Sequence, residues 1–323
     1  MYLNKSWLRC GALVLVSAGI FFAGAASALT LGQEQKPQAQ GFAISEDVDI
    51  VLLPVTVTNG RGQFVSGLEA SDFQVYEDGQ LQKISSFRSE DVPVTVGLVV
   101  DHSGSMAAWR DQVIAGARAF VQDSNSQDKE FVANFGNGVR LALPPNVPFT
   151  GNVNELQAAL SLPYASGNTA LYDAVVSALQ HVQEDQLNKK VLLLISDGGD
   201  NASQHTFKQA LKMAQSANVI IYSIGLLDEH DADQNAGVLR KFAAATGGQS
   251  YFPGSAAEVV ADCRRIAGDI RHQYTLGYSP TNTSNAGYRK IRVRVAAHGR
   301  GKLIVRTRGG YFLPPPATAG HTD

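Results

Sequence analysis

The sequence predicts an α/β protein in which a doubly wound, mostly parallel sheet is inserted into a small β-sandwich. Short apolar runs alternate with helical patterns over residues 91–274, which is typical of a parallel sheet covered by helices. Residues 44–90 and 275–313 show strand-like patterns instead, and neither segment holds enough strands to be stable alone. We therefore expect these N- and C-terminal segments to form one sandwich together.

The first β segment contains two strand signals. Residues 48–59 are rich in β-branched side chains, and Pro54 indicates an edge or a break. The Asp-Gly pair at 78–79 separates two strand-like runs, which is a strong signal for a hairpin. The last β segment alternates apolar and basic residues over 291–295, turns at a glycine-rich stretch and resumes as a strand. Residues 314–323 are expected to be disordered.

The inserted segment alternates strands and helices. Strands are expected at 93–100, 191–195 and 219–227, because these continuous apolar runs resemble strands buried on both faces of a parallel sheet. The stretch EFVANF-GNG-VRLAL predicts a hairpin at the sheet edge. Helices with one apolar face are expected around residues 113–121, 171–182, 207–217, 236–246 and 255–273.

The N-terminal segment precedes this folded part. Lys5, Arg9, an apolar run and small residues up to Ala28 have the layout of a secretory signal peptide, residues 1–28. An uncleaved membrane anchor is the alternative, because the apolar run approaches the length that spans a bilayer. The polar, Gln-rich residues 29–43 predict a linker. Both interpretations place the body of the protein outside the cytoplasm, either periplasmic or secreted.

Composition narrows the class of protein. The 323 residues are 44% hydrophobic and carry a net charge of −2, so the chain lacks the basic excess of most nucleic-acid-binding proteins. Of its two cysteines, Cys10 lies in the predicted signal peptide, which leaves Cys263 without an internal disulfide partner. Cys263 falls in line with Val259 and Ile266 at helical spacing, which favours a buried apolar side chain over a reactive thiol.

Three oxygen-rich loops are expected at one edge of the sheet, because ligand-binding loops gather at the carboxyl ends of parallel strands. VVDHSGSM places Asp101, Ser103 and Ser105 after the first strand. SGNTALYD places Thr169 before a helix, and ISDGGDN places Asp197 after another strand. These are hard oxygen donors, without the His and Cys cluster that zinc prefers. The set predicts a Mg²⁺ or Mn²⁺ site, with Ca²⁺ as a weaker candidate.

The donor set also suggests how such an ion would act. Three neutral hydroxyls and two carboxylates leave a divalent ion incompletely neutralised and partly open, so that it can accept an Asp or Glu carboxylate from another protein. Each loop taken alone also fits an ordinary turn or helix cap, and the hypothesis depends on the joint placement of all five residues. His102 is expected to face solvent, because Mg²⁺ selects oxygen. Asp200 is expected to support the third loop by hydrogen bonding.

The motif Asp101-x-Ser103-x-Ser105, with Thr169 and Asp197 in the other two loops, resembles the metal-ion-dependent adhesion site of von Willebrand factor A domains. The flanking stretches GLEASDFQVYEDGQLQKISSF and YTLGYSP…YRKIRVRV…RGGYF resemble bacterial proteins of this family with an acidobacterial-type architecture. The resemblance implies a Rossmann-like sheet with the ion at its top. It also implies that the two serines contact the ion directly and that Thr169 does so when a ligand is engaged. The two aspartates would hold the ion directly or through water.

Three functional hypotheses follow. The leading one is a non-enzymatic, extracytoplasmic adhesion or binding protein that captures a partner's carboxylate through the metal. The second is a hydrolase that uses the ion as a Lewis acid, although no H-E-x-x-H, G-x-S-x-G or P-loop pattern occurs. The third is a structural module whose β-sandwich carries the interaction. We expect no nucleic-acid partner, and membrane contact only if the N-terminal segment stays uncleaved.

Two charged stretches lie outside the motif. The acidic run at 228–234 is expected to be solvated, with an effect on partner choice as the alternative. Basic residues of the last segment predict an ordinary exposed strand face, with a basic stripe for an anionic polymer as the alternative. These basic residues are Arg289, Lys290, Arg292, Arg294, Lys302, Arg306 and Arg308.

Overall fold

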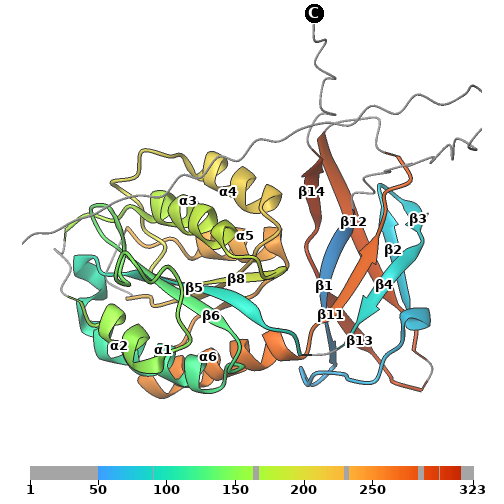
Figure 1. Ribbon diagram of the computed structural model, residues 1–323, viewed down its shortest axis with the longest axis horizontal. Coiled ribbons are helices and arrows are strands. Elements are labelled where there is room, and N and C mark those ends of the chain that lie inside the picture. Colours follow the sequence, from blue (N-terminus) through green and yellow to red (C-terminus); the bar gives the residue numbers. More distant parts are fainter. Residues whose placement is uncertain are drawn as a thin grey trace, which may run out of the picture. The chain divides into compact units, whose positions relative to one another are not determined.

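The computed structural model describes residues 50–89, 91–162, 167–228, 233–282, 287–297 and 299–313. All of them belong to one of the two units into which the chain divides, residues 47–323. The predicted signal peptide, linker and C-terminal tail lie outside the described residues. Within those residues, the strands form one six-stranded and two four-stranded sheets (Figure 1).

The inserted segment forms the predicted, mostly parallel sheet. Its strands are β5 (Val94–Asp101), β6 (Lys129–Phe135), β7 (Val139–Leu141), β8 (Lys189–Ser196), β9 (Ile220–Gly225) and β10 (Ser250–Tyr251). They are arranged in the order β10-β9-β8-β5-β6-β7. All pairs are parallel except the predicted β6–β7 hairpin at the edge, which is antiparallel. Every residue of β5 is buried, as the continuous apolar run predicts.

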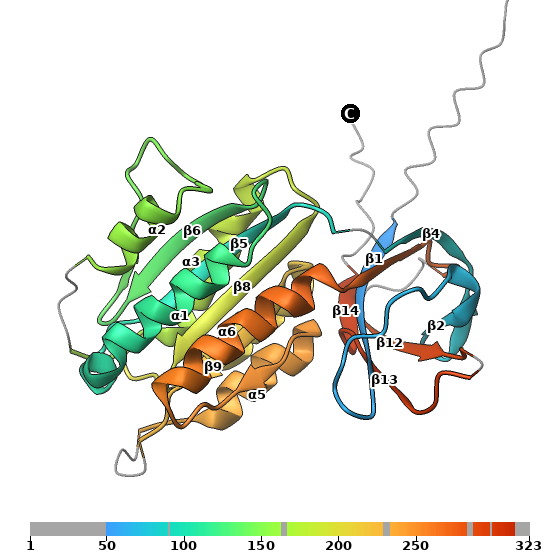
Figure 2. The same cartoon turned by 90° about the horizontal axis from the view of Figure 1, so that it is seen from below.

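Helices cover both faces of this sheet (Figures 1 and 2). One face packs against α1 (Arg110–Gln122), α2 (Val153–Leu160) and α6 (Ala256–Arg271). The other packs against α3 (Leu171–His181), α4 (Phe207–Ser216) and α5 (Ala236–Thr246). Of these helices, α2 was not predicted from the sequence. Among the described helices, none combines the length and apolarity needed to cross a membrane.

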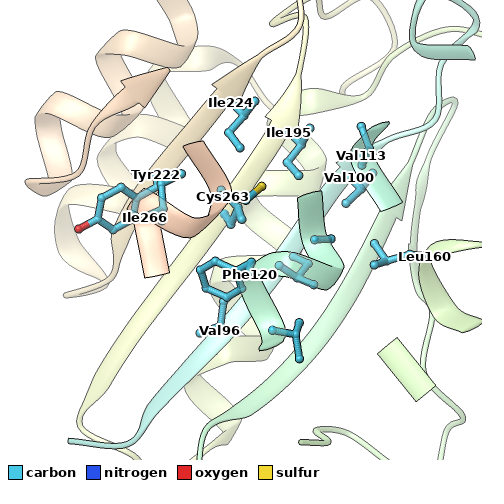
Figure 3. Packing of buried hydrophobic residues seen from close by; sticks show 14 of the residues in the cluster. Val96, Val100, Val113, Phe120, Leu160, Ile195, Tyr222, Ile224, Cys263 and Ile266 are labelled. Carbon is cyan, nitrogen blue, oxygen red and sulfur yellow. The ribbon is translucent and has the colours of Figure 1, made fainter. Parts of the chain in front are cut away.

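The core beneath α1 and α6 shows why these two helices pack closely. Phe120, Cys263 and Ile266 gather over the sheet next to Val96 (Figure 3). A Cβ at Gly116 of α1 would lie 2.9 Å from the Cys263 sulfur, so glycine permits this approach. Cys263 is fully buried, as expected, and burial raises the pKa of its thiol to about 12.

The flanking segments form the predicted sandwich. Its strands are β1 (Val51–Asn59), β2 (Phe73–Glu77), β3 (Gln80–Gln82), β4 (Ile84–Arg88), β11 (Tyr274–Tyr278), β12 (Gly287–Val295), β13 (Leu303–Arg306) and β14 (Gly310–Leu313). The sheet orders are β13-β1-β11-β4 and β14-β12-β2-β3, and each sheet contains strands from both segments. Apolar side chains from both sheets, among them Leu53, Val75 and Leu276, form one core.

Local sequence signals explain the connections within the sandwich. Asp78 and Gly79 have φ angles of 48° and 85°, so the Asp-Gly pair makes the left-handed turn that joins β2 to β3. The chain also turns between β12 and β13, as predicted. It passes there to the other sheet, because β13 pairs with β1.

Candidate metal centre

The three oxygen-rich loops meet at the carboxyl ends of β5 and β8. The first loop follows β5, the second precedes α3, and the third follows β8. Together they line a pocket of about 290 Å³ that includes Ser103, Ser105, Thr169 and Asp197. The lining of this pocket does not include Asp101, which is buried beside it. The fold therefore brings four of the five predicted ligands to one pocket.

Hydrogen bonds connect the first and third loops directly. The Ser103 and Ser105 hydroxyl oxygens are 3.1 Å apart, and the Ser105 hydroxyl donates to Asp197 Oδ2 at 2.6 Å. Adjacent ligands of an octahedral Mg²⁺ ion, with metal–oxygen distances of about 2.1 Å, lie about 3 Å apart. These three side chains thus already have a spacing that fits shared coordination of one small ion.

Asp101 is held rigidly next to this group. Its Oδ1 accepts a hydrogen bond from the Ser103 amide at 2.8 Å, and its Oδ2 accepts one from the Ser196 hydroxyl at 2.7 Å. The carboxyl is 3% exposed. Burial raises its pKa to about 6, the hydrogen bonds oppose this rise, and the nearby Asp197 charge adds to it. A bound cation would favour the ionised carboxylate.

Thr169 lies on the second loop, which is joined to the third loop through the backbone. The Thr169 amide donates to Asn201 Oδ1 at 2.8 Å, and the Asn201 amide donates to the Thr169 carbonyl at 2.9 Å. Thr169 is 7% exposed, and none of its described hydrogen bonds reaches the other four predicted ligands. The loop thus presents this residue to the pocket without linking its side chain to the hydroxyl–carboxylate chain.

Supporting residues tie the third loop to the start of α3. Asp200 Oδ1 accepts hydrogen bonds from the Tyr172 amide at 3.1 Å and the Ser203 hydroxyl at 2.5 Å, which is the supporting role expected for it. Asp173 accepts from the Gln204 and His205 amides, each at 2.9 Å. These bonds fix the loop that carries Asp197.

The supporting role of Asp173 was not predicted from the sequence, and neither were those of Ser196 and Asn201 at the third loop. Ser196 and Asn201 lie within the ISDGGDN stretch, whose run of polar residues directly after a strand was the available signal. Their roles depend on which loop each faces, and that is decided by the order of the strands.

The expectation that His102 faces solvent is wrong. His102 is 5% exposed, and its amide donates to the Phe135 carbonyl at 2.7 Å, which continues the pairing of β5 with β6 by one residue. Its ring faces Asn134, and burial together with the charge of Arg110 lowers its pKa. The side chain is therefore part of the packing beneath the loops.

The charge balance of the site is unusual. Asp101 and Asp197 are 3% and 4% exposed, yet no Lys or Arg of the described residues forms an ion pair with either carboxylate. In the part of the chain that the structure describes, no cluster of three or more His, Cys, Asp or Glu side chains has a metal-binding arrangement. The candidate centre depends instead on two carboxylates and three hydroxyls.

The strand order, the covering helices and the oxygen-rich loops define a doubly wound α/β domain with a candidate cation site above its sheet. The chain belongs to the von Willebrand factor type A domain family, because the model of that family matches residues 95–262, slightly more than half of the chain. This family membership confirms the resemblance seen in the sequence. No curated protein matches the chain in sequence.

Solved structures are similar to this chain at low sequence identity. A von Willebrand factor type A protein from Catenulispora acidiphila is 13% identical, with a TM-score of 0.50, over 82% of this chain and 72% of that chain. The vWF domain of the pilus tip protein Mfa5 from Porphyromonas gingivalis is 14% identical, with a TM-score of 0.47, over 56% and 95%. Mussel byssus proximal thread matrix protein 1, with zinc in its metal-ion-dependent adhesion site (MIDAS) motif, is 15% identical, with a TM-score of 0.47. The match covers 60% of this chain and 49% of that chain.

Proposed function

We propose that this protein is an extracytoplasmic, non-enzymatic binding or adhesion protein that captures a protein partner's carboxylate through a divalent ion. The proposed ligands are Asp101, Ser103, Ser105, Thr169 and Asp197. The observation that carries this proposal is the pair of buried carboxylates without a described cationic partner. Buried charges in proteins are otherwise paired or bound to metals. Domains of this family commonly mediate protein interactions.

The donor chemistry favours Mg²⁺ or Mn²⁺ over Ca²⁺. Hydroxyl and carboxylate oxygens suit hard cations, and five ligand residues with only two carboxylates suit Mg²⁺, which keeps several waters, better than Ca²⁺, which takes six to eight oxygen ligands. When bound, the ion would supply positive charge to an incoming carboxylate. The chain's own residues orient the donors and leave room for that group.

The direction of approach follows from burial. Gly104 and Ser105 are exposed, whereas Asp101, Ser103 and Asp197 are buried, so a partner reaches the donors from the pocket side. An octahedral ion has six ligand positions, and five residues cannot fill them. The sixth position is the one proposed for the partner's Asp or Glu. Export of the protein is proposed from the layout of residues 1–28 alone.

Metal-linked stability tests this proposal. Thermal unfolding of the protein in EDTA is compared with unfolding in excess Mg²⁺, Mn²⁺ or Ca²⁺. A ligand that binds only the folded state, at 100 times its Kd, adds about 2.7 kcal/mol. We expect such a gain in the wild type and its loss in Asp101→Ala, whereas Asp111→Ala, at an exposed position of α1, keeps it. A wild type that no metal stabilises, or an equal gain in Asp101→Ala, would contradict the proposal.

A further inference from the structure

The outward face of the β14-β12-β2-β3 sheet carries a row of cations. Lys290, Arg292 and Arg294 on β12 are exposed, while Ile291 and Val293 between them point into the sandwich core. Alternate residues of an antiparallel strand are about 6.8 Å apart. The three cations line a hollow of about 660 Å³ on this face. We call this surface, formed by the three cations with Tyr76 and Tyr288, the β12 face.

The two aromatic rings of the β12 face have different surroundings, and Tyr288 is 39% exposed. The Arg294 guanidinium lies over the Tyr76 ring at 5.3 Å. Tyr288 packs edge to face against Phe312, with ring centroids 5.2 Å apart, and Lys212 of α4 lies over the Phe312 ring at 5.5 Å. The β12 face therefore offers a ligand its three cations and one partly exposed ring, Tyr288.

The positive charge of the β12 face is not neutralised locally. Residues 275–313 contain eight lysines and arginines and no aspartate or glutamate. Among the described residues, no carboxylate forms an ion pair with Lys290, Arg292 or Arg294. The other arginines of the predicted stripe differ. Arg289 and Arg308 are buried, and Arg306 pairs with Asp269.

We propose that the β12 face binds an acidic polysaccharide, with Lys290, Arg292 and Arg294 contacting successive carboxylate or sulfate groups. A row of regularly spaced, uncompensated cations along a hollow is complementary to an extended polyanion. Single-stranded nucleic acids use several rings on which successive bases stack, whereas Arg294 lies over the Tyr76 ring here and leaves Tyr288 as the more open of the two rings. This function is separate from the metal site, because its residues lie on the sandwich and none of them is a proposed metal ligand.

The test measures binding of the full chain to alginate and heparin at low salt. The variant Lys290→Gln/Arg292→Gln/Arg294→Gln should bind about tenfold more weakly or worse, since three exposed ion pairs contribute jointly. Its matched control, Arg118→Gln/Arg140→Gln/Lys208→Gln, removes the same charge from exposed positions of the α/β segment and should keep binding within about twofold. EDTA should leave binding unchanged, which separates this result from failure of the metal site.

Several outcomes would overturn the proposal. They are no wild-type binding to either polysaccharide, an equal loss in the control, and tighter binding to an oligo(dT) strand or to phosphatidylserine vesicles. Arg292→Lys/Arg294→Lys keeps the charge and should retain most of the binding. A loss in this variant as complete as in the glutamine variant would indicate a structural role and would also count against the proposal.

Discussion

The two ends of the central sheet both contain buried carboxylates, but they stabilise them differently. At the amino ends, Asp128 accepts hydrogen bonds from the Val94 and Asn125 amides at 2.9 and 3.0 Å and forms an ion pair with Arg271 of α6. At the carboxyl ends, Asp101 and Asp197 accept hydrogen bonds from hydroxyls and amides. Within the described chain, neither has an ion-pair partner.

Because of this difference, we interpret the amino end of the sheet as a structural site and the carboxyl end as a candidate binding site. At the amino end, cations of the chain balance Asp128 and Asp185, the latter through a 2.7 Å pair with Lys129. At the carboxyl end, Asp101 and Asp197 accept hydrogen bonds, but among the described residues no Lys or Arg side chain pairs with them. We expect mutations at the two ends to respond differently to added metal.

The largest effect is expected from breaking the amino-end pair. Asp128→Ala removes the buried partner of the Arg271 guanidinium, which is 12% exposed, and leaves it the more exposed Asp91 at 2.8 Å. Removal of one member of a buried pair costs about 3–5 kcal/mol. The free energy of unfolding, measured with urea, should fall by this amount equally in EDTA and in Mg²⁺.

The matched control is Asp123→Ala. Asp123 lies 3.6 Å from Arg264, and both side chains are about half exposed, so the loss should stay below about 1 kcal/mol. A similar loss of stability in both variants would mean that the buried pair stabilises the protein no more than an exposed pair does. The proposed difference between the two ends of the sheet would then be wrong.

A smaller effect, which depends on pH, is expected at Glu130, near the start of β6. Glu130 is 1% exposed, and among the described residues its Oε1 has no hydrogen-bond partner. Burial, with a further contribution from the Asp128 charge, raises its pKa to about 8, while Ser124 and Arg271 oppose the rise. The folded state therefore keeps the proton that the unfolded state loses from about pH 4.5 upward.

The expected result is a stability difference that changes with pH. The Glu130 contribution is fully present below about pH 4.5 and is lost as pH rises to about 8. Relative to the wild type, Glu130→Gln should become more stable across this window, by a few kcal/mol in total. Urea unfolding at a series of pH values measures this, with Glu155→Gln, at an exposed position, as the control. A constant difference between Glu130→Gln and the wild type would refute the expectation.

The smallest change is expected at the carboxyl end without metal. Asp197→Asn keeps an acceptor for the Ser105 hydroxyl and removes a negative charge close to Asp101. In EDTA its free energy of unfolding should differ from the wild type by about 1 kcal/mol or less. In saturating Mg²⁺ the free energy of unfolding of the variant should be lower than that of the wild type, because the variant loses a charged ligand. A large loss in EDTA would show that Asp197 is structural, as Asp128 is.

Much of the fold was predictable because burial leaves a clear pattern. β5 and β8 are continuous apolar runs, and the Asp-Gly pair at 78–79 requires two left-handed residues. The helix α2 was missed because its eight residues are too few for a clear helical period. The burial of His102 was not predicted, because it follows from the hydrogen bond of its amide with Phe135 at the end of β6. A pattern in the neighbouring sequence cannot indicate such a contact.

For the candidate site, the residues could be predicted from the sequence, but the contacts between them could not. The five proposed ligands follow from residue type and from their place after strands or before a helix. The contact of Ser105 with Asp197 joins residues 92 positions apart and needed the strand order. The expectation that Arg289 lies on an exposed strand face is wrong, because it is buried. Its neighbour Glu77, 3.8 Å away, is visible only in the folded sandwich.

The pairing of β1 with β11 has a consequence for the order of folding. In the register, Val51 lies opposite Tyr278, so the first strand pairs with one made more than 200 residues later. At about 5–20 residues per second, synthesis of that interval takes roughly 10–40 s. The α/β segment is contiguous and can complete its core first, while β1 to β4 wait with unpaired edges. We expect closure of the sandwich to be the late step, in which the α/β segment brings β4 beside β11, with Arg88 opposite Thr275.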